Sequence, residues 1–398
     1  MLVFTGARLF DGERFLDDCA LIVEGEEIVG VTPHNERPRS GTERDLGGDI
    51  LAPGFIDWQV NGGGGTLFNE APTVEGIRAI VEAHRKFGTT AMLPTVITDA
   101  PGTLAAALDA ARAASREIPG SLGIHVEGPF IDPRRKGAHP LEWIRPMRES
   151  DAAALIAARS GVMVVTLAPA SVSSERVAEL AKSGIVVSLG HSDATTEEAR
   201  TVFDAGATAV THLFNAMSQL SHRAPSVVGA ALTDPRVICG FIADGYHVHE
   251  AATRVAFKTK GVGGIALVSD AMPPAAGGPK IYELNGRRVT QDGLRLTLDD
   301  GTLAGAAITM LDAVRYVHQT LHLELADALA MATSTPARLL RIDDKLGRLK
   351  QGFRADLVQL NDDLSLMGVW VRGVETPLPK GEGGQNSSHA SATTPANA

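Results

Sequence analysis

The sequence has few cysteines, few aromatic side chains and no excess of positive charge. Only two of its 398 residues are cysteines, Cys19 and Cys239, so we expect neither a disulfide framework nor a thiolate metal cluster. A net charge of −10 argues against nucleic acid or an anionic membrane as a main partner, because both are bound by basic surfaces. A small phosphorylated ligand remains compatible with this charge, since one or two well-placed cationic groups are enough to bind it.

The sequence also lacks any long apolar run. No stretch of eighteen apolar residues occurs, and residues 1–10 (MLVFTGARLF) resemble a strand more than a basic region followed by an apolar signal core. We therefore expect a cytoplasmic protein with reduced cysteines and no membrane span. Its 44% hydrophobic and 21% charged residues are ordinary values for a globular enzyme.

Between about residues 50 and 272, apolar runs alternate with Ala-rich segments that have helical spacing. Several runs are almost continuously apolar, as parallel strands buried on both faces are. We expect eight strands, at 50–60, 89–98, 122–130, 162–170, 185–192, 207–217, 237–247 and 264–272. Eight β–α units in this length predict a (β/α)₈ barrel of the TIM type. An open doubly wound sheet is the alternative that the same alternation permits.

The two chain ends consist of short β runs broken by turn residues. Residues 1–50 and 345–378 are each too short to form a good core alone, so we expect one small β-sandwich made from both. The barrel would then occupy residues 51–344, with a β-hairpin insertion near 277–302. The polar tail, 379–398, cannot bury enough apolar surface to fold and is expected to be disordered.

Three candidate metal ligands end three of the expected strands. In a barrel the carboxyl ends of the strands face the active site, and Glu127, His191 and His212 end the third, fifth and sixth strands. Two histidines and one carboxylate are a common ligand set for a catalytic divalent ion that keeps one position open for water. A lone buried histidine is more often a partner in a core hydrogen bond, but three such residues at three strand ends favour a metal site.

Other polar residues around these ends are candidates for catalysis and binding. Asp270 ends the eighth strand, where a carboxylate can take a proton from water and return it to a leaving amine; an ordinary helix N-cap or loop aspartate is the competing interpretation. His139 can polarise a carbonyl, although a solvated loop histidine fits its local sequence equally well. Arg223 and His247 can both bind phosphate, with an ordinary surface arginine as the alternative for Arg223.

Eight segments together carry a resemblance to a known family. They are LAPGFIDWQVNG (51–62), HVEGPF (125–130), KGAH (136–139), LGHSDAT (189–195), THLFNAM (211–217), IADGYHV (242–248), LVSDAM (267–272) and LAGAAITM (303–310). From about residue 4 to residue 374 the chain resembles the N-acetylglucosamine-6-phosphate deacetylases of the amidohydrolase superfamily. The resemblance implies hydrolysis of N-acetyl-D-glucosamine 6-phosphate to D-glucosamine 6-phosphate and acetate, in amino sugar catabolism and cell-wall recycling.

The resemblance also implies a role for individual residues. Glu127, His191 and His212 would hold the metal, Asp270 would act as general base and acid, and His139 would orient the substrate and stabilise the oxyanion. Arg223 would reach the active site of a neighbouring subunit, which implies a homodimer. The implied substrate-binding residues are Ala138, His139, Asn215, Ala216, Arg223, His247, Leu303, Ala304 and Gly305, and the segment 303–310 would line the acetyl pocket.

The residues after the first barrel strand distinguish this chain within the superfamily. Most amidohydrolases carry His-X-His there, which supplies a second metal site, whereas this chain has Gln59 and Asn61. Neutral amides are poor zinc ligands, so we expect a degenerate second site and one divalent ion per subunit. Zinc is favoured, but iron, manganese and cobalt accept the same ligands.

Two other classes of function are weighed against this interpretation. A different amidohydrolase, acting on another N-acyl or cyclic amide, should carry His-X-His and often a bridging lysine, yet no lysine ends an expected strand. A barrel that has become a binding protein should have lost a ligand or Asp270, and all four residues are present. The sequence leaves open which metal is used and whether other N-acetylated hexosamine phosphates are substrates.

Overall fold

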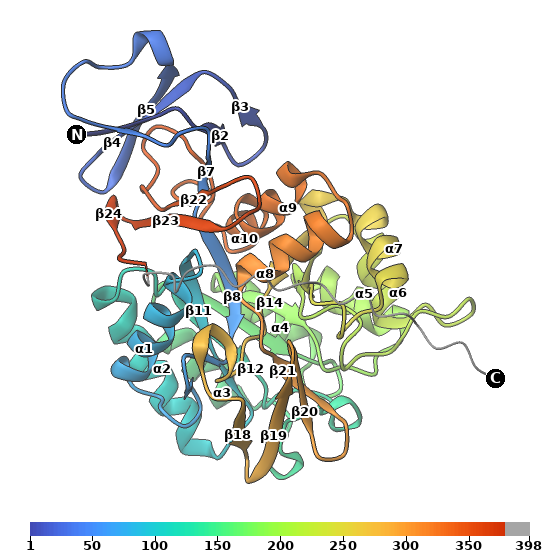
Figure 1. Ribbon diagram of the computed structural model, residues 1–398. Helices are drawn as coiled ribbons and strands as arrows, with labels where there is room; N and C mark the ends of the chain where they lie inside the picture. The colour runs from blue at the N-terminus through green and yellow to red at the C-terminus, as the bar shows by residue number, and fades with distance from the viewer. Residues whose placement is uncertain (379–398) are drawn as a thin grey trace.

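The computed structural model describes residues 1–378, which centre on an eight-stranded parallel sheet rolled into a nearly closed barrel (Figure 1). In sheet order, which is also chain order, the strands are β8 (Phe55–Val60), β11 (Thr89–Ile97), β12 (Gly123–Glu127), β13 (Val162–Leu167), β14 (Val186–Leu189), β15 (Ala209–Val210), β16 (Ile238–Ile242) and β17 (Ile265–Val268). The last strand returns to the first where the Asp270 N–H donates to the Gln59 carbonyl at 3.0 Å. The expected barrel is confirmed, and the doubly wound alternative is wrong.

Helices cover the outside of the barrel. They are α1 (Val74–Arg85), α2 (Pro101–Glu117), α3 (Glu149–Ala158), α4 (Ser174–Lys182), α5 (Thr196–Asp204), α6 (Ser226–Thr233), α7 (Glu250–Lys260), α8 (Met310–Arg315), α9 (Leu325–Ala332) and α10 (Ser334–Leu339). Helix α1 shows how the sequence sets them: Thr73 caps its first turn, and Ile77 and Ile80 bury one face against the barrel. None of the described helices combines the length and apolar character needed to cross a bilayer.

The strand expected over 50–60 is two strands in two different sheets. Strand β7 (Ile50–Pro53) pairs with β2 (Arg8–Phe10) and β22 (Leu357–Leu360), whereas β8 belongs to the barrel. The chain crosses between the sheets at Gly54, where a Cβ would lie 2.1 Å from the Thr90 hydroxyl oxygen. Both halves are fully buried, so one continuous apolar run hid the break.

The chain ends form two sheets that share one core. A four-stranded sheet has the order β5 (Glu27–Pro33), β4 (Cys19–Glu24), β1 (Leu2–Thr5) and β6 (Thr42–Asp45). A six-stranded sheet has the order β24 (Val374–Glu375), β23 (Leu366–Val371), β22, β7, β2 and β3 (Phe15–Leu16). Phe4 and Trp370 meet edge to face between them, with ring centroids 5.0 Å apart. The expected small β module from both ends is present, and the tail 379–398 lies outside the described residues.

The segment after β17 is a four-stranded antiparallel sheet, one hairpin larger than expected. Its strands are β18 (Ile281–Leu284), β19 (Arg287–Asp292), β20 (Arg295–Leu298) and β21 (Leu303–Ala306). It lies at the carboxyl ends of the barrel strands, on the opposite side of the barrel from the chain-end sheets (Figure 1). Strand β21 returns to the barrel, where the Ala306 N–H donates to the Asp270 carbonyl and the Met272 N–H donates to the Ala306 carbonyl, both at 3.0 Å. A smaller ribbon, β9 (Gly62–Gly63) with β10 (Thr66–Leu67), follows β8.

Candidate active site

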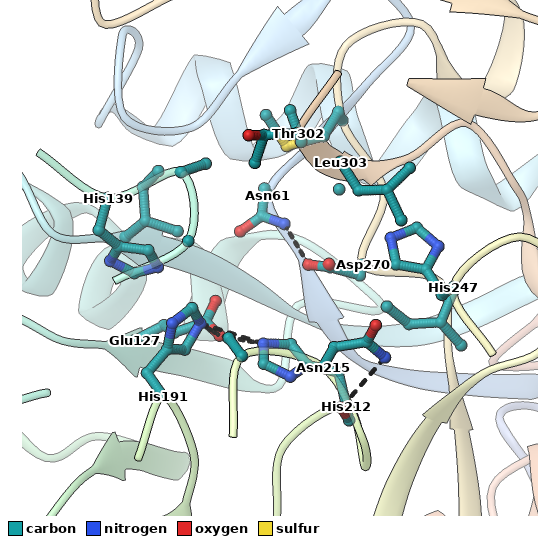
Figure 2. A pocket seen from close by; sticks show the side chains of 18 of the residues that line it. Asn61, Glu127, His139, His191, His212, Asn215, His247, Asp270, Thr302 and Leu303 are labelled. Carbon is teal, nitrogen blue, oxygen red and sulfur yellow. Dashed lines mark hydrogen bonds and ion pairs between the residues drawn. The ribbon is translucent and has the colours of Figure 1, made fainter. Parts of the chain in front are cut away.

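A pocket of about 400 Å³ opens where the barrel strand ends meet β21 (Figure 2). Its lining includes the predicted catalytic residues, metal ligands and substrate-binding residues except Arg223, and of the segment 303–310 it includes Leu303, Ala304 and Gly305. The lining residues are Asn61, Ile97, Glu127, Arg134, Arg135, Gly137, Ala138, His139, His191, His212, Asn215, Ala216, Ile242, His247, Asp270, Met272, Leu284, Thr302, Leu303, Ala304 and Gly305. The lining residues are spread over nearly 250 positions of the sequence, from 61 to 305, and the fold brings them together around one cavity.

Glu127, His191 and His212 form a tight triangle at the floor of the pocket (Figure 2). Glu127 Oε1 lies 3.2 Å from His191 Nε2 and 3.1 Å from His212 Nε2, and the two Nε2 atoms are 3.1 Å apart. Zinc bound at its usual distances would hold two tetrahedral ligand atoms about 3.3 Å apart. The spacing of the three atoms would therefore suit three ligands of a tetrahedral zinc ion, and all three residues line the cavity.

The backbone at these strand ends is strained. His191 and His212 have positive φ angles of 46° and 31°, and Asp270 has 48°. Residues other than glycine rarely adopt this left-handed region, and such strain concentrates at functional sites. The sharp turn after each short strand points the side chain across the barrel mouth, so three separate strand ends can meet at one point.

Electrostatics in the triangle favours a bound cation. Burial alone would raise the pKa of Glu127, but hydrogen bonds with His191 and His212 hold it well below its usual range. Burial would likewise lower the pKa of His212, and the hydrogen bond and charge of Glu127 raise it instead. Glu127 is therefore ionised at neutral pH, which makes it an immediate ligand for a divalent ion.

His191 directs Nε2 into the triangle and holds Nδ1 away from it. Its Nδ1 lies 2.9 Å from the carbonyl oxygen of Arg135. A carbonyl can only accept a hydrogen bond, so Nδ1 carries a proton, and Nε2 can bind a metal ion once it gives up its own proton and the hydrogen bond to Glu127. Such a carbonyl partner orients many metal-binding histidines, and it supports His191 as a ligand.

Asp270 follows the last barrel strand and faces the triangle, and Figure 2 shows its contact with Asn61. Its Oδ1 accepts hydrogen bonds from Asn61 Nδ2 at 2.7 Å and from Gln59 Nε2 at 3.0 Å. Burial and the nearby charge of Glu127 raise the pKa of Asp270 to about 6. The next helical turn begins only at Ala275, so the N-cap interpretation is wrong. A carboxylate with this pKa is well suited to accept and return a proton near neutral pH.

Gln59 and Asn61 lie where a second metal site would require ligands. Gln59 Nε2 is 3.3 Å from both carboxylate oxygens of Glu127, in addition to its bond to Asp270. Amide nitrogens donate hydrogen bonds and cannot bind a metal ion. The Gln59 nitrogen lies between the carboxylates of Glu127 and Asp270, where it acts as a hydrogen-bond donor. The degenerate second site stays a prediction, which the metal content of the protein can test.

His139 is buried rather than solvated, with only 3% of its surface exposed, so the loop-histidine interpretation is wrong. Burial and the neighbouring His191 keep its pKa well below the usual range, which makes the ring neutral. One of its ring nitrogens lies within 4.8 Å of ligand atoms of Glu127 and His191. By distance alone, His139 therefore competes with His212 for the place of third ligand.

Thr98 is a contact of His139 that the sequence analysis missed. The Thr98 hydroxyl oxygen lies 2.7 Å from His139 Nδ1, and the Thr98 backbone N–H donates to the same nitrogen at 3.3 Å. The signal was present, since Thr98 directly follows β11 just as the other site residues follow their strands. It was passed over because a threonine is neither titratable nor a metal ligand.

The other end of the pocket carries the expected phosphate ligands. Asn215 and His247 lie on the far side of Asp270 from His139 (Figure 2). His247 Nδ1 is 2.7 Å from a carboxylate oxygen of buried Asp244, which fixes the ring with Nε2 free for a ligand. Ala216 has a positive φ of 49° in the same loop. Arg223 is exposed in the loop before α6 and does not line the pocket of its own subunit.

Strand β21 closes the pocket with small and apolar groups. Leu303, Ala304 and Gly305 line the cavity, and Gly305 has a positive φ of 68°, with space so limited that a Cβ would lie 2.5 Å from Met272 Cγ. Ile97, Met272, Leu284 and Thr302 add to this wall and were not predicted. Their common feature is an apolar or neutral side chain, which gives no signal in a single sequence.

Comparison with known proteins agrees with the fold and with the site. The model of the amidohydrolase family matches residues 50–376, and that of the NagA composite domain matches residues 1–51. An N-acetylgalactosamine-6-phosphate deacetylase of Shewanella sp. is 40% identical, over 94% of this chain and 95% of its own. An N-acetylglucosamine-6-phosphate deacetylase of Haemophilus influenzae is 34% identical, over 90% of this chain and 94% of its own.

A solved structure gives the same result in three dimensions. The crystal structure of N-acetylglucosamine-6-phosphate deacetylase from Pasteurella multocida superposes with a TM-score of 0.91 and 33% sequence identity. The match covers 94% of this chain and 99% of that one, so it includes the barrel, the chain-end sheets and the insertion together.

Proposed function

The chain belongs to the amidohydrolase family, and from this we propose that it hydrolyses the acetamido group of an N-acetyl-D-hexosamine 6-phosphate. N-acetyl-D-glucosamine 6-phosphate is the first candidate, with D-glucosamine 6-phosphate and acetate as products. The observation that carries the proposal is the placement of Asp270 beside the Glu127, His191 and His212 triangle, in a pocket whose other end holds His247 and Asn215. The alternative of a different amide gains no support from the relatives compared above.

The triangle fits a single divalent ion, and zinc suits its ligands and spacing, as iron, manganese and cobalt also do. When bound, such an ion supplies Lewis acidity and lowers the pKa of a water molecule toward neutrality. Glu127 contributes the negative charge of the site, and the two histidines contribute neutral nitrogen lone pairs.

Residues of the chain perform proton transfer, stabilise the developing oxyanion and bind the phosphate. The two amides engage only Oδ1 of Asp270, which leaves Oδ2 to take the proton of the attacking water and return it to the departing amine. His139 donates a hydrogen bond to the acetyl oxygen as negative charge develops on it. His247 and Asn215 hold the phosphate, so the sugar lies across the pocket with its acetamido group toward Glu127.

N-acetyl-D-galactosamine 6-phosphate is the second candidate substrate. The relative at 40% identity is named for the galactosamine compound, and the relative at 34% for the glucosamine compound. The two sugars differ only in the configuration at C4, which lies between the acetamido group and the phosphate. The residues that contact C4 therefore decide between the candidates, while the acetamide chemistry is shared.

Acetate release from a panel of sugars tests the proposal. The panel contains the 6-phosphates of N-acetylglucosamine, N-acetylgalactosamine and N-acetylmannosamine, with unphosphorylated N-acetylglucosamine as the matched control, each with and without chelator. We expect chelator-sensitive release from at least one of the first two phosphates and far slower release from the control. If no member of the panel released acetate from the metal-loaded protein, the proposed function would be wrong.

The amides at Gln59 and Asn61 predict about one tightly bound metal ion per subunit. Elemental analysis of the purified protein after gel filtration measures this ratio. The double variant Gln59→His and Asn61→His is the matched comparison, because it restores imidazole ligands at both positions and should allow a second ion. Two chelator-resistant ions in the wild-type protein would contradict the prediction.

We also propose a cytoplasmic homodimer in which Arg223 reaches the phosphate in the neighbouring subunit. Arg223 is exposed and lies outside the pocket of its own subunit, which is where a residue serving a partner should lie. Cys19 and Cys239 are both free, which fits a reducing compartment.

Replacing Arg223 by alanine should raise KM for the phosphorylated substrate about 10- to 100-fold, since a charged hydrogen bond contributes about 1.5–3 kcal/mol. The preference for the phosphorylated sugar over N-acetylglucosamine should largely disappear. The control is Arg112→Ala, an exposed arginine of α2 that pairs with Asp109; neither residue lines the pocket. Mixing Arg223→Ala subunits with Asp270→Asn subunits should restore activity, because the hybrid dimer has one site with both residues. Inactive hybrids and an unchanged preference would remove Arg223 from the phosphate site.

A further inference from the structure

We propose that Thr98 is a positioning residue that keeps the proton of His139 on Nε2. The ring then faces the pocket as a hydrogen-bond donor to the acetyl oxygen and cannot bind the metal ion. The catalytic consequence rests on the proposed deacetylase function, whereas the position of the proton is a property of the protein without substrate.

The geometry around Nδ1 of His139 selects one tautomer. The backbone N–H of Thr98 points at this nitrogen from 3.3 Å, and the Thr98 hydroxyl oxygen lies 2.7 Å from it. A backbone N–H can only donate, so the contact is favourable only when Nδ1 has a free lone pair. The hydroxyl can rotate to donate to the same lone pair. The single proton of the neutral ring must then be on Nε2.

Neighbouring residues hold this pair in place. Thr98 is 1% exposed and His139 3% exposed, so water cannot replace either partner. Gly128, with a φ of 81°, lies against them, and a Cβ there would be 2.2 Å from the Thr98 hydroxyl oxygen and 3.5 Å from His139 Nδ1. The Arg287 guanidinium, from the insertion, donates to the carbonyl of Ala138 and so anchors the loop that carries His139.

The same reasoning decides which histidine is the third metal ligand. Ligand atoms of Glu127, His139 and His191 lie within 4.8 Å of one another, a set with the same chemistry as Glu127, His191 and His212. A protonated Nε2 has no lone pair to give to a metal ion, so His139 is the donor and His212 the ligand. His191 is fixed in the opposite tautomer, because its Nδ1 donates to the Arg135 carbonyl. His139 and His191 are both buried in this pocket, and the hydrogen-bond partner of each Nδ1 atom determines whether the ring acts as a hydrogen-bond donor or as a metal ligand.

Nitrogen-15 spectroscopy of the zinc-loaded protein tests the tautomer directly. Histidine-labelled protein gives long-range proton–nitrogen correlations that distinguish a protonated Nδ1 from a protonated Nε2, and His139→Gln identifies the signal. We expect Nε2–H for His139 and Nδ1–H for His191. A proton on Nδ1 of His139 in the wild-type protein would overturn the proposal, whatever substrate the enzyme uses.

Two variants of Thr98 test the consequence for catalysis. Thr98→Val removes the hydroxyl with little change of shape and should lower kcat about tenfold, the loss of one buried hydrogen bond, with KM within about twofold and metal content unchanged. Thr98→Ser keeps the hydroxyl and should keep both kcat and the Nε2–H signal. An unchanged kcat in Thr98→Val, or loss of the Nε2–H signal in Thr98→Ser, would contradict the positioning role. Failure of the proposed function would instead appear as no acetate release by wild type, with the tautomer still measurable.

Discussion

Replacing Asp270 by asparagine is expected to leave the fold and the metal content intact and to lower acetate release by at least about 10⁴-fold. The amide has nearly the shape of the carboxylate, so packing against the barrel floor should survive. It lacks a basic oxygen for the water's proton, and it has no proton to return to the amine. General acid–base catalysis contributes typically about 10²–10⁴-fold, and here one residue performs both transfers. Single-turnover acetate release by the metal-loaded variant, beside a substrate binding titration, measures the effect.

The pH profile provides the control for this experiment. Asp270 must be ionised to act as base, and burial together with the charge of Glu127 raises its pKa to about 6. Activity should therefore fall as the pH decreases through this value, and a bound cation, which favours the carboxylate, moves the midpoint to about 6 or below. The residual rate of Asp270→Asn should lack this acidic limb. A variant within tenfold of wild type would mean that another group is the base, with His139 the first to test.

Replacing His191 or His212 by alanine is expected to remove both bound metal and nearly all activity. Each supplies one of three ligand atoms that lie 3.1–3.2 Å apart, and a site reduced to two protein ligands binds a divalent ion poorly. His139→Ala is the matched control, because it removes a third buried histidine from the same pocket. This control should keep its metal and lose only catalysis. Elemental analysis of the three variants separates the outcomes, and stoichiometric metal in His212→Ala would overturn the ligand assignment.

The barrel strands and the polar residues at their carboxyl ends were predictable from the sequence, because both leave a recognisable pattern of apolar and polar residues. Buried parallel strands require apolar runs, and Glu127, His191, His212 and Asp270 each interrupt such a run at its end. Burying a charged or polar group there costs free energy unless it is hydrogen-bonded, paired or bound to a metal ion, so each interruption pointed to such a partner. The resemblance to deacetylases added the roles of residues such as Asn215 and Leu303, which have no such signal of their own.

The rest of the site depends on three-dimensional proximity that a single sequence does not encode. Thr98 and His139 are 41 positions apart, and their contact exists only because the loop after β12 folds back over the end of β11. The break at Gly54 was missed because burial on both sides produced one uninterrupted apolar pattern. The insertion was recognised as β structure, but its full set of four strands was not, since β21 is a short run of small residues.

The attachment of the insertion to the barrel has a consequence for how the enzyme can diverge. The segment leaves the barrel at Met272 and returns at Ala306, and these two residues are hydrogen-bonded to each other. Its ends are therefore already together, and a change in its length alters the cost of loop closure only slowly. Insertions or deletions in the turns between β18, β19 and β20 should leave Asp270 in place, because the bond from Ala306 holds the Asp270 carbonyl independently of them. The part of the wall that faces the sugar can thus change by mutation while the hydrolytic groups stay fixed, which is a route by which one barrel could acquire different hexosamine preferences.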